Sequence, residues 1–358
     1  MKSDFIFLRA LRHVDHTVFS VADGQKFYWD PVFGIRAPYS SGQQVKRCIL
    51  ESLGMNLGEQ PASFTFIFDL KNESLGEGEV LSVCDPTYYD QLLGGWMYAS
   101  KAIEGKVKER TLKRRSPLSI SAMRPLHPLL AGVSVENITF DRSDRPELHK
   151  VVVRDANGKV MNEEDVTRFL EGTDRSLRRK WIPENTRAEG IFVYDIAIDL
   201  RTLFAVSVNQ HEPELREDTI KKLKEAGWVE GVNVFGECLI MPKERREEMI
   251  PALAHALINW RITSNQSRTF SLMETLAVAV SDNANKLAGS IRAKLQKSGE
   301  KSKAEVIIDE CAGADVFITL PCAGYIVTEK ESVDALERAE QRLVSMMMAY
   351  DYENQLKK

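Results

Sequence analysis

Residues 191–200 read IFVYDIAIDL and form the most strongly strand-like stretch of the chain. Aromatic and β-branched side chains dominate it, and such side chains fit a pleated, half-buried strand. The N-terminal stretch DFIFLRALRHV (4–14) is a second strand candidate, followed after a break by the shorter HTVFSV (16–21). A third apolar stretch, at 271–282, fits a strand or a helix. The core is therefore expected to contain a sheet.

Helical patterns separate these stretches, so the chain is expected to belong to the α+β class. In SGQQVKRCILESLG (41–54), Val45, Ile49 and Leu53 recur on one helical face, with a serine where the N-cap stands and Gly54 as the expected end. Further helices are expected over 216–228, over 245–260 with Pro251 as a kink, and over 329–355.

Length and composition bound the class of protein. At roughly 150 residues per domain, 358 residues correspond to two domains or to one core with large insertions. Hydrophobic residues make up 43% and charged residues 28%, which is typical of a soluble globular protein and excludes disorder of the whole chain. The N-terminus is a poor signal peptide because Asp4 and Arg9 interrupt it, and the five cysteines form no CxxC pair. We expect a cytoplasmic protein without a membrane span.

Known catalytic and metal-binding patterns are missing from the sequence. It contains no P-loop, GxGxxG, GxSxG or HExxH motif. His13 and His16 would point to opposite faces of a strand, so they would not share a metal ion. Asp195 and Asp199 would share one face and could serve acid–base chemistry, although a strand edge or end explains them more simply. We predict neither a cofactor nor a metal.

Two polar, basic clusters are typical of a nucleic-acid backbone site instead. The first surrounds the start of the helix at 41–54, where free N–H groups and the helix dipole favour phosphate. Taken alone, it is better explained as a solvated helix face with a serine cap.

A second cluster follows Trp260, and basic runs occur at 106–115 and 175–180. The net charge is −4, so the basic residues are expected to form a local groove on an acidic protein. The clusters comprise Arg36, Ser40, Ser41, Gln43, Gln44, Lys46 and Arg47, then Arg261, Asn265, Gln266, Ser267 and Arg268, with Arg178 and Arg179 in the later basic run.

Three segments resemble one family. GIRAPYSSGQQVKRCILESL (34–53) resembles the first signature of CRISPR-associated RAMP proteins, in which a Ser-Ser-x-x-x-Lys-Arg helix start follows the first strand. IFVYDIAIDLRTLFAV (191–206) and INWRITSNQSRTFSLMETLAVAVSDN (258–283) resemble later segments of the DevR-type backbone subunit of Cascade-like interference complexes. Their order and spacing carry the resemblance, which extends from about residue 5 to 285.

The resemblance implies a palm of modified RRM or ferredoxin-like topology over 1–58, 117–148 and 190–358, a fingers insertion over 59–116 and a thumb hairpin over 149–189. It implies a non-catalytic, RNA-binding role in antiviral defence. Copies of such a subunit assemble head-to-tail along a guide RNA (crRNA) into a helical filament, with other Cascade subunits, and present the guide for pairing with target DNA or RNA. Both polar clusters would then hold guide phosphates.

Two alternatives remain open. A type III-like backbone subunit would also cleave target RNA through an aspartate in the loop after the first strand, where Asp23 and Asp30 lie, with a divalent metal. A solvated loop aspartate or an Asp-Pro turn explains these residues better. The second alternative is a metabolic α+β enzyme. Co-purified RNA of defined length would exclude that enzyme.

Overall fold

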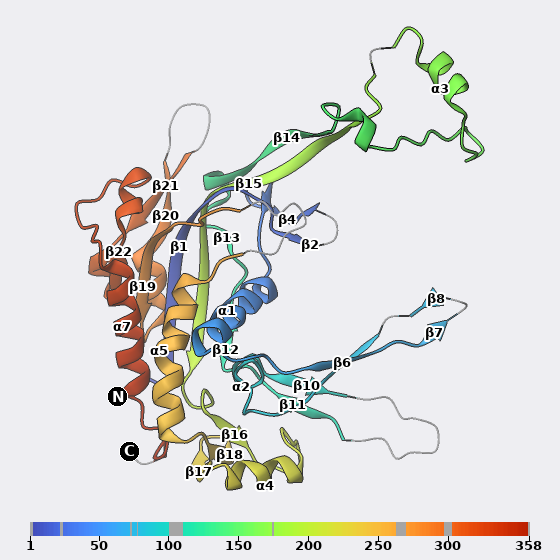
Figure 1. Cartoon of the computed structure of the whole chain (residues 1–358). Coiled ribbons are helices and arrows are strands. Elements are labelled where there is room, and N and C mark those ends of the chain that lie inside the picture. Colours follow the sequence, from blue (N-terminus) through green and yellow to red (C-terminus); the bar gives the residue numbers. More distant parts are fainter. Residues whose placement is uncertain are drawn as a thin grey trace.

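The computed structural model describes residues 3–21, 24–71, 74–76, 78–99, 110–173, 175–262, 270–296 and 303–356. Its centre is an antiparallel sheet, which confirms the α+β class (Figure 1). Strand order across the sheet is β12 (Leu118–Ile120), β15 (Arg179–Asp199), β1 (Phe5–Thr17), β19 (Thr275–Ser281) and β22 (Asp315–Ile318). The short β13 (Arg124–Pro125) and the longer β14 (Ala131–Asp141) also pair with β15.

Side chains of the central strands alternate between two cores. Leu8 of β1 and Val278 of β19 enter the larger core, whereas Leu11 and Ala277 enter the smaller one, as the period of two in a strand requires. Helices α1 (Gly42–Leu57), α5 (Lys243–Asn259) and α7 (Ala335–Met348) contribute to the larger core. The smaller core is packed by α6 (Ala284–Ser290) and the hairpin of β20 (Ile291–Gln296) and β21 (Lys303–Ile308).

The expected helices are all present, with different ends. Helix α1 continues past Gly54 to Leu57 and ends at Gly58, whose φ of 67° suits a glycine C-cap. Gly54 lies inside the helix. A glycine is needed at this position because a side chain would collide with the ring and hydroxyl of Tyr89. Pro251 is accommodated within α5. Both α4 (Glu217–Glu225) and α7 are shorter than expected.

One strand expectation was partly wrong, and an open one is now decided. The N-terminal strand β1 runs to Thr17 through a register irregularity after Val14, instead of breaking there. The apolar stretch at 275–281 is strand β19, and all seven of its residues are buried. Within the thumb hairpin implied over 149–189, Asn157 and Gly158 lie in a turn flanked by a single bridge between Arg154 and Val160.

Peripheral hairpins surround the sheet. Segment 59–116 contains α2 (Tyr89–Gly94) and the pairs β6 (Phe64–Ile67) with β9 (Glu79–Ser82), β7 (Leu70–Lys71) with β8 (Ser74–Leu75), and β10 (Trp96–Tyr98) with β11 (Leu112–Arg114). The basic residues at 106–109 lie outside the described residues. Smaller units are β16 (Ala205–Ser207), β18 (Gly236–Ile240) and β17 (Val229–Asn233), then β2 (Ser20–Val21) with β3 (Gly24–Gln25), and β4 (Phe27–Asp30) with β5 (Ile35–Pro38).

A long arm leaves the sheet along β15. Residues 190–199 of this strand pair with β1, whereas residues 179–190 pair with β14. Gly190 stands at the transition with φ 127°, and a side chain there would collide with the Leu130 carbonyl. Residues 142–173 and 175–178, which include α3 (Glu163–Leu170), form the far end of the arm (Figure 1). The arm therefore begins at β14, within the range expected to belong to the palm.

A buried arginine joins β1 to the end of α5. The guanidinium of Arg12 donates to the carbonyls of Ile258 and Trp260 at 2.6 and 2.9 Å and lies 4.2 Å from the Trp260 ring centroid. Tyr194 of β15 donates its hydroxyl to the Leu257 carbonyl at 2.8 Å. These donors satisfy carbonyls that a helix C-terminus leaves unpaired. Burial lowers the pKa of Arg12 from its ordinary value.

We expect Arg12→Met to lower the free energy of unfolding by about 2–4 kcal/mol, because it leaves buried helix-end carbonyls without donors. Arg12→Lys should recover part of the loss, since an ammonium still donates. Arg47→Met is the matched control, because Arg47 is exposed and pairs with Glu51 one turn along α1; it should cost under about 0.5 kcal/mol. Urea titration measures all three, and equal costs for Arg12→Met and Arg47→Met would contradict the assignment.

Candidate nucleic-acid interface

The start of α1 is built as the sequence predicts. Ser41 is the N-cap, and its hydroxyl accepts from the backbone N–H of Gln44 at 3.4 Å. Ser40 is fully buried and donates its hydroxyl to the Gln44 side chain at 2.9 Å, while its backbone pairs with Met123. Gln43 is exposed in the first turn. The surface at this helix start therefore belongs to Ser41 and Gln43, whereas Ser40 shapes it from beneath.

Arginines stacked on aromatic rings lie beside this helix start. The guanidinium of Arg36 on β5 lies 4.1 Å from the ring centroid of Phe27. Arg124 of β13 lies 4.8 Å from Tyr28 and 5.9 Å from Tyr39. Such planar groups next to positive charge suit the bases and phosphates of a single strand. Arg124 escaped the sequence analysis because it stands alone in a short apolar stretch, with no basic neighbour.

Lys46 and Arg47 differ in their surroundings. The Lys46 ammonium donates to the Gly94 carbonyl at 2.7 Å, which leaves two of its three N–H groups for another acceptor. Burial lowers the pKa of Lys46 to about 8, so it remains charged at pH 7. The Arg47 guanidinium is exposed and donates to Glu51 at 2.7 Å. An incoming phosphate would compete with that carboxylate for Arg47.

The far end of the arm carries a basic hollow of about 380 Å³, the tip hollow. Arg179 is paired there with Asp141 at 2.7 Å, and Arg142 lies 4.5 Å from the ring centroid of Phe140. Hydrogen bonds from Ser143 and from Arg179 hold the pKa of Asp141 at about 2. The basic residues that line the hollow are Arg142, His149, Lys150, Arg178, Arg179 and Lys180, with Leu148 and Phe140 among the apolar ones.

The structure gathers Arg178 and Arg179 with basic residues that are distant in sequence. Arg142, His149 and Lys150 come from the stretch DRSDRPELHK (141–150), where acidic residues interrupt the positive charge. No basic run marks this stretch, so sequence reasoning missed it. The register of β14 against β15, which pairs Asp141 with Arg179, brings the two stretches together.

The second polar cluster is described in part. Arg261 follows α5 and donates to the carbonyls of Asn259 and Trp260. Burial and the neighbouring Arg12 lower the pKa of Arg261 to about 10. Asn265, Gln266, Ser267 and Arg268 lie outside the described residues.

The candidate acid–base residues are occupied by other contacts. Asp30 accepts from the backbone N–H groups of Val32 and Phe33 at 3.0 Å, as a turn-capping aspartate does, and Asp23 lies outside the described residues. Arg9 binds Asp195 through two hydrogen bonds of 2.7 and 2.9 Å. The carboxylate of Asp199 accepts from the Arg201 guanidinium and the Arg201 backbone N–H.

His13 and His16 contact different residues. His13 lies 3.2 Å from Glu274, and His16 lies 3.0 Å from Glu136. Within the described part of the chain, His, Cys, Asp and Glu residues form no group that could hold a metal ion. None of the described helices has the length and apolar character needed to cross a membrane.

Comparisons with known proteins give only distant likenesses. No family model matches the chain, and no curated protein matches it in sequence. A chain of a solved structure titled "CRISPR RNA-guided surveillance complex" is 10% identical at a TM-score of 0.38, with 95% of this chain and 80% of that chain covered. A chain of another, titled "CRISPR RNA-guided surveillance complex, pre-nicking", is 9% identical at a TM-score of 0.42, with 95% and 89% covered.

If Lys46 holds a phosphate, raising the pH from 7 to 9 should remove that contact, because the lysine loses its proton as the pH passes its pKa of about 8. For a single-stranded oligoadenylate, the slope of log affinity against log salt should flatten by about 0.7 over this range. Lys46→Arg should keep the same slope at both pH values, since arginine stays charged. Equal pH dependence in the two proteins would remove Lys46 from the interface.

The tip hollow predicts a second salt effect. Lys150→Ala with Lys180→Ala should flatten the salt slope of single-stranded RNA binding by about 1.4, since two phosphate contacts are lost. The control is Lys221→Ala with Lys222→Ala, which removes the same charge from the exposed face of α4, away from the arm (Figure 1). Fluorescence anisotropy at several salt concentrations measures the slopes. Equal flattening in both double variants would reduce the effect to net charge.

Proposed function

We propose that this chain is a non-catalytic backbone subunit of a CRISPR interference complex. Copies of it assemble head-to-tail along a guide RNA and present the guide for pairing with target nucleic acid, together with other subunits of a Cascade-like complex in the cytoplasm. The proposal rests on the sequence resemblance of segments 34–53, 191–206 and 258–283, and on the distribution of basic side chains in the fold.

One observation carries the proposal: an arm projects from the sheet (Figure 1), and the basic hollow lies on this arm, where the β14–β15 ribbon ends. Six basic side chains around Phe140 and Leu148 suit a polyanion with exposed bases. An arm that reaches beyond its own domain suits contact with RNA and a neighbouring copy. Repeating such a heterologous contact without closure produces an open helix.

The central sheet fits the palm that the resemblance implies. In chain order the elements run β1, α1, β12, β15, α5 and β19, and across the sheet the strands run β12, β15, β1 and β19. This β-α-β-β-α-β order of the selected elements supports the proposal of a ferredoxin-like palm, to which β13, β14 and β22 are added in the same sheet. We assign 59–116 to the fingers, and we extend the thumb from the expected 149–189 to 131–190, because β14 and the first half of β15 form one ribbon.

The helix start of α1 is proposed as the palm contact with guide phosphates. It packs against α2 in the fingers, and β5, which precedes it, contacts β14 in the arm. The contacts there would be made to the RNA backbone and to the faces of its bases. The residues proposed to make them are Ser41, Gln43, Lys46, Arg36 and Arg124. Backbone contacts carry no sequence information, which suits a subunit that holds guides of any sequence.

The arm tip can be removed without disturbing the sheet. Because Asp141 pairs with Arg179, an Asn-Gly turn can replace residues 142–178 and close the β14–β15 ribbon. The full chain should purify with nuclease-sensitive RNA and form regular filaments on a guide under the electron microscope. The tip-deleted protein should stay folded by circular dichroism but lose regular filaments. Absence of bound RNA from the full chain, or unchanged filaments after deletion, would contradict the proposal.

A further inference from the structure

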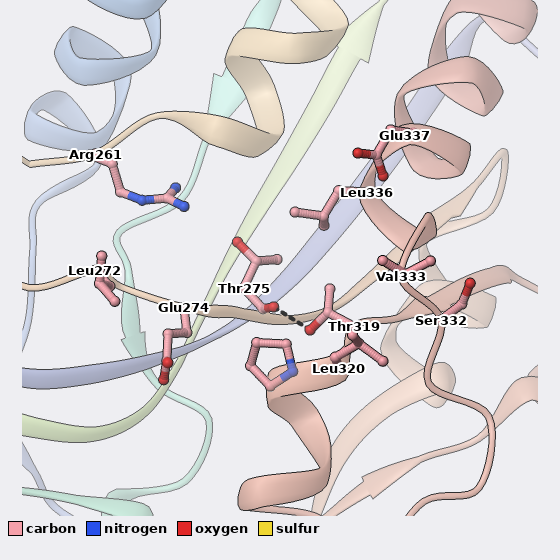
Figure 2. Close-up of a pocket in the computed structure, with 11 residues that line it drawn as sticks. Arg261, Leu272, Glu274, Thr275, Thr319, Leu320, Ser332, Val333, Leu336 and Glu337 are labelled. Carbon is pink, nitrogen blue, oxygen red and sulfur yellow. Dashed lines mark hydrogen bonds between the residues drawn. The ribbon is translucent and has the colours of Figure 1, made fainter.

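A second cavity, of about 370 Å³, is separate from the arm (Figure 2). It lies where the end of α5, the start of β19, the short 3-10 helix η4 (Leu320–Gly324) and the start of α7 meet. Aliphatic side chains form much of its wall, and Val333 at its mouth is 82% exposed. Its volume is in the range of small-ligand sites. The aliphatic lining residues are Leu272, Leu320, Val333 and Leu336, with Pro321 beside them.

Three polar groups in this cavity have hydrogen-bonding capacity to spare. The Arg261 guanidinium uses its Nη1 group on carbonyls of its own segment and forms no ion pair with the described residues. The Thr275 hydroxyl is buried, and no hydrogen-bond partner for it is found in the described part of the chain. Glu337 lies in the first turn of α7. In Figure 2, Arg261 and Glu337 lie on opposite sides of the cavity, with Thr275 between them.

These groups restrict the class of ligand. Glu337 and Glu274 would repel a phosphate, and Glu274 already accepts from the Tyr325 hydroxyl at 3.1 Å. A purely aliphatic ligand would leave the remaining N–H groups of the half-buried Arg261 guanidinium without an acceptor, which costs free energy. A flat ligand with acceptors along one edge and donors along the other satisfies both sides. Guanine has this pattern: O6 and N7 accept, while N1–H and N2–H donate.

We propose that this cavity binds a guanine base that leaves the stack of a single-stranded RNA. Arg261 donates to O6 and N7, Glu337 accepts from N1–H and N2–H, and the aliphatic wall covers the faces of the base. The RNA source rests on the proposed function, whereas the recognition of guanine rests on the cavity alone. Arg261 thereby contributes base recognition, in addition to its place in the sequence-predicted RNA cluster.

The test compares an oligouridylate with the same strand carrying one central guanosine. The full chain should bind the guanosine strand about tenfold more tightly, the discrimination expected of a bidentate arginine contact. Val333→Trp should abolish this preference by filling the mouth of the cavity. Val327→Trp is the matched control, because Val327 is fully exposed and does not line the cavity, and it should keep the preference. A preference that survives Val333→Trp overturns the proposal.

Free nucleotides separate this inference from the proposed function. Guanosine 5′-monophosphate should give saturation-transfer signals by NMR in the full chain, and Val333→Trp or Arg261→Ala should remove them. Adenosine 5′-monophosphate giving equal signals would overturn the choice of guanine. RNA binding without guanosine preference would refute the cavity and leave the backbone role intact. Guanosine monophosphate binding by a chain that holds no RNA would refute the backbone role and leave the cavity intact.

Discussion

One strand, β15, belongs both to the central sheet and to the arm. Its last ten residues are hydrogen-bonded to β1 in the centre of the sheet, and its preceding residues are hydrogen-bonded to β14 in the arm. A flexible linker would leave the direction of the arm open, whereas a continuous strand transmits the sheet's orientation to the tip. Gly190 permits the change of partner at the junction, because no larger residue fits its backbone angle and its contact with Leu130. The position of the tip hollow depends on this strand.

Ion pairs at the base of the arm reinforce this connection. Arg187 of β15, which is 3% exposed, binds Glu136 of β14 at 3.0 Å, and the same carboxylate lies 3.0 Å from His16 of β1. Farther along the sheet, Arg9 binds Asp195. The described ion pairs near the sheet join opposite charges, whereas basic residues predominate in the lining of the tip hollow. A protein with a net charge of −4 can in this way present a strongly basic surface where it reaches outward.

The sequence predicts the elements better than their ends and partners. The alternation of 191–200 and the spacing of Val45, Ile49 and Leu53 identify β15 and α1, because local periodicity reflects a buried face. Gly54 was misjudged as a helix end because its requirement is tertiary: Tyr89 occupies the space of its missing side chain. The extent of β15 was equally hidden, since its first half is polar and is held by pairing with β14. Long-range pairing leaves no local pattern to read.

The same contrast between local patterns and long-range pairing applies to the candidate site. The sequence predicts Ser41 and Lys46 as site residues because a helix start with nearby cations is a local feature. Arg124 and Lys150 join the candidate interface only through the strand register, so no sequence run marks them. Ser40 illustrates the converse, since a residue in the right motif can be buried by its pairing with Met123. Contacts to a polymer of any sequence need only correctly placed charges and rings, and placement is what the fold adds. The proposed base recognition demands more, namely a donor and an acceptor on opposite sides of one cavity, and Arg261 and Glu337 line the same cavity because α5 and α7 pack together.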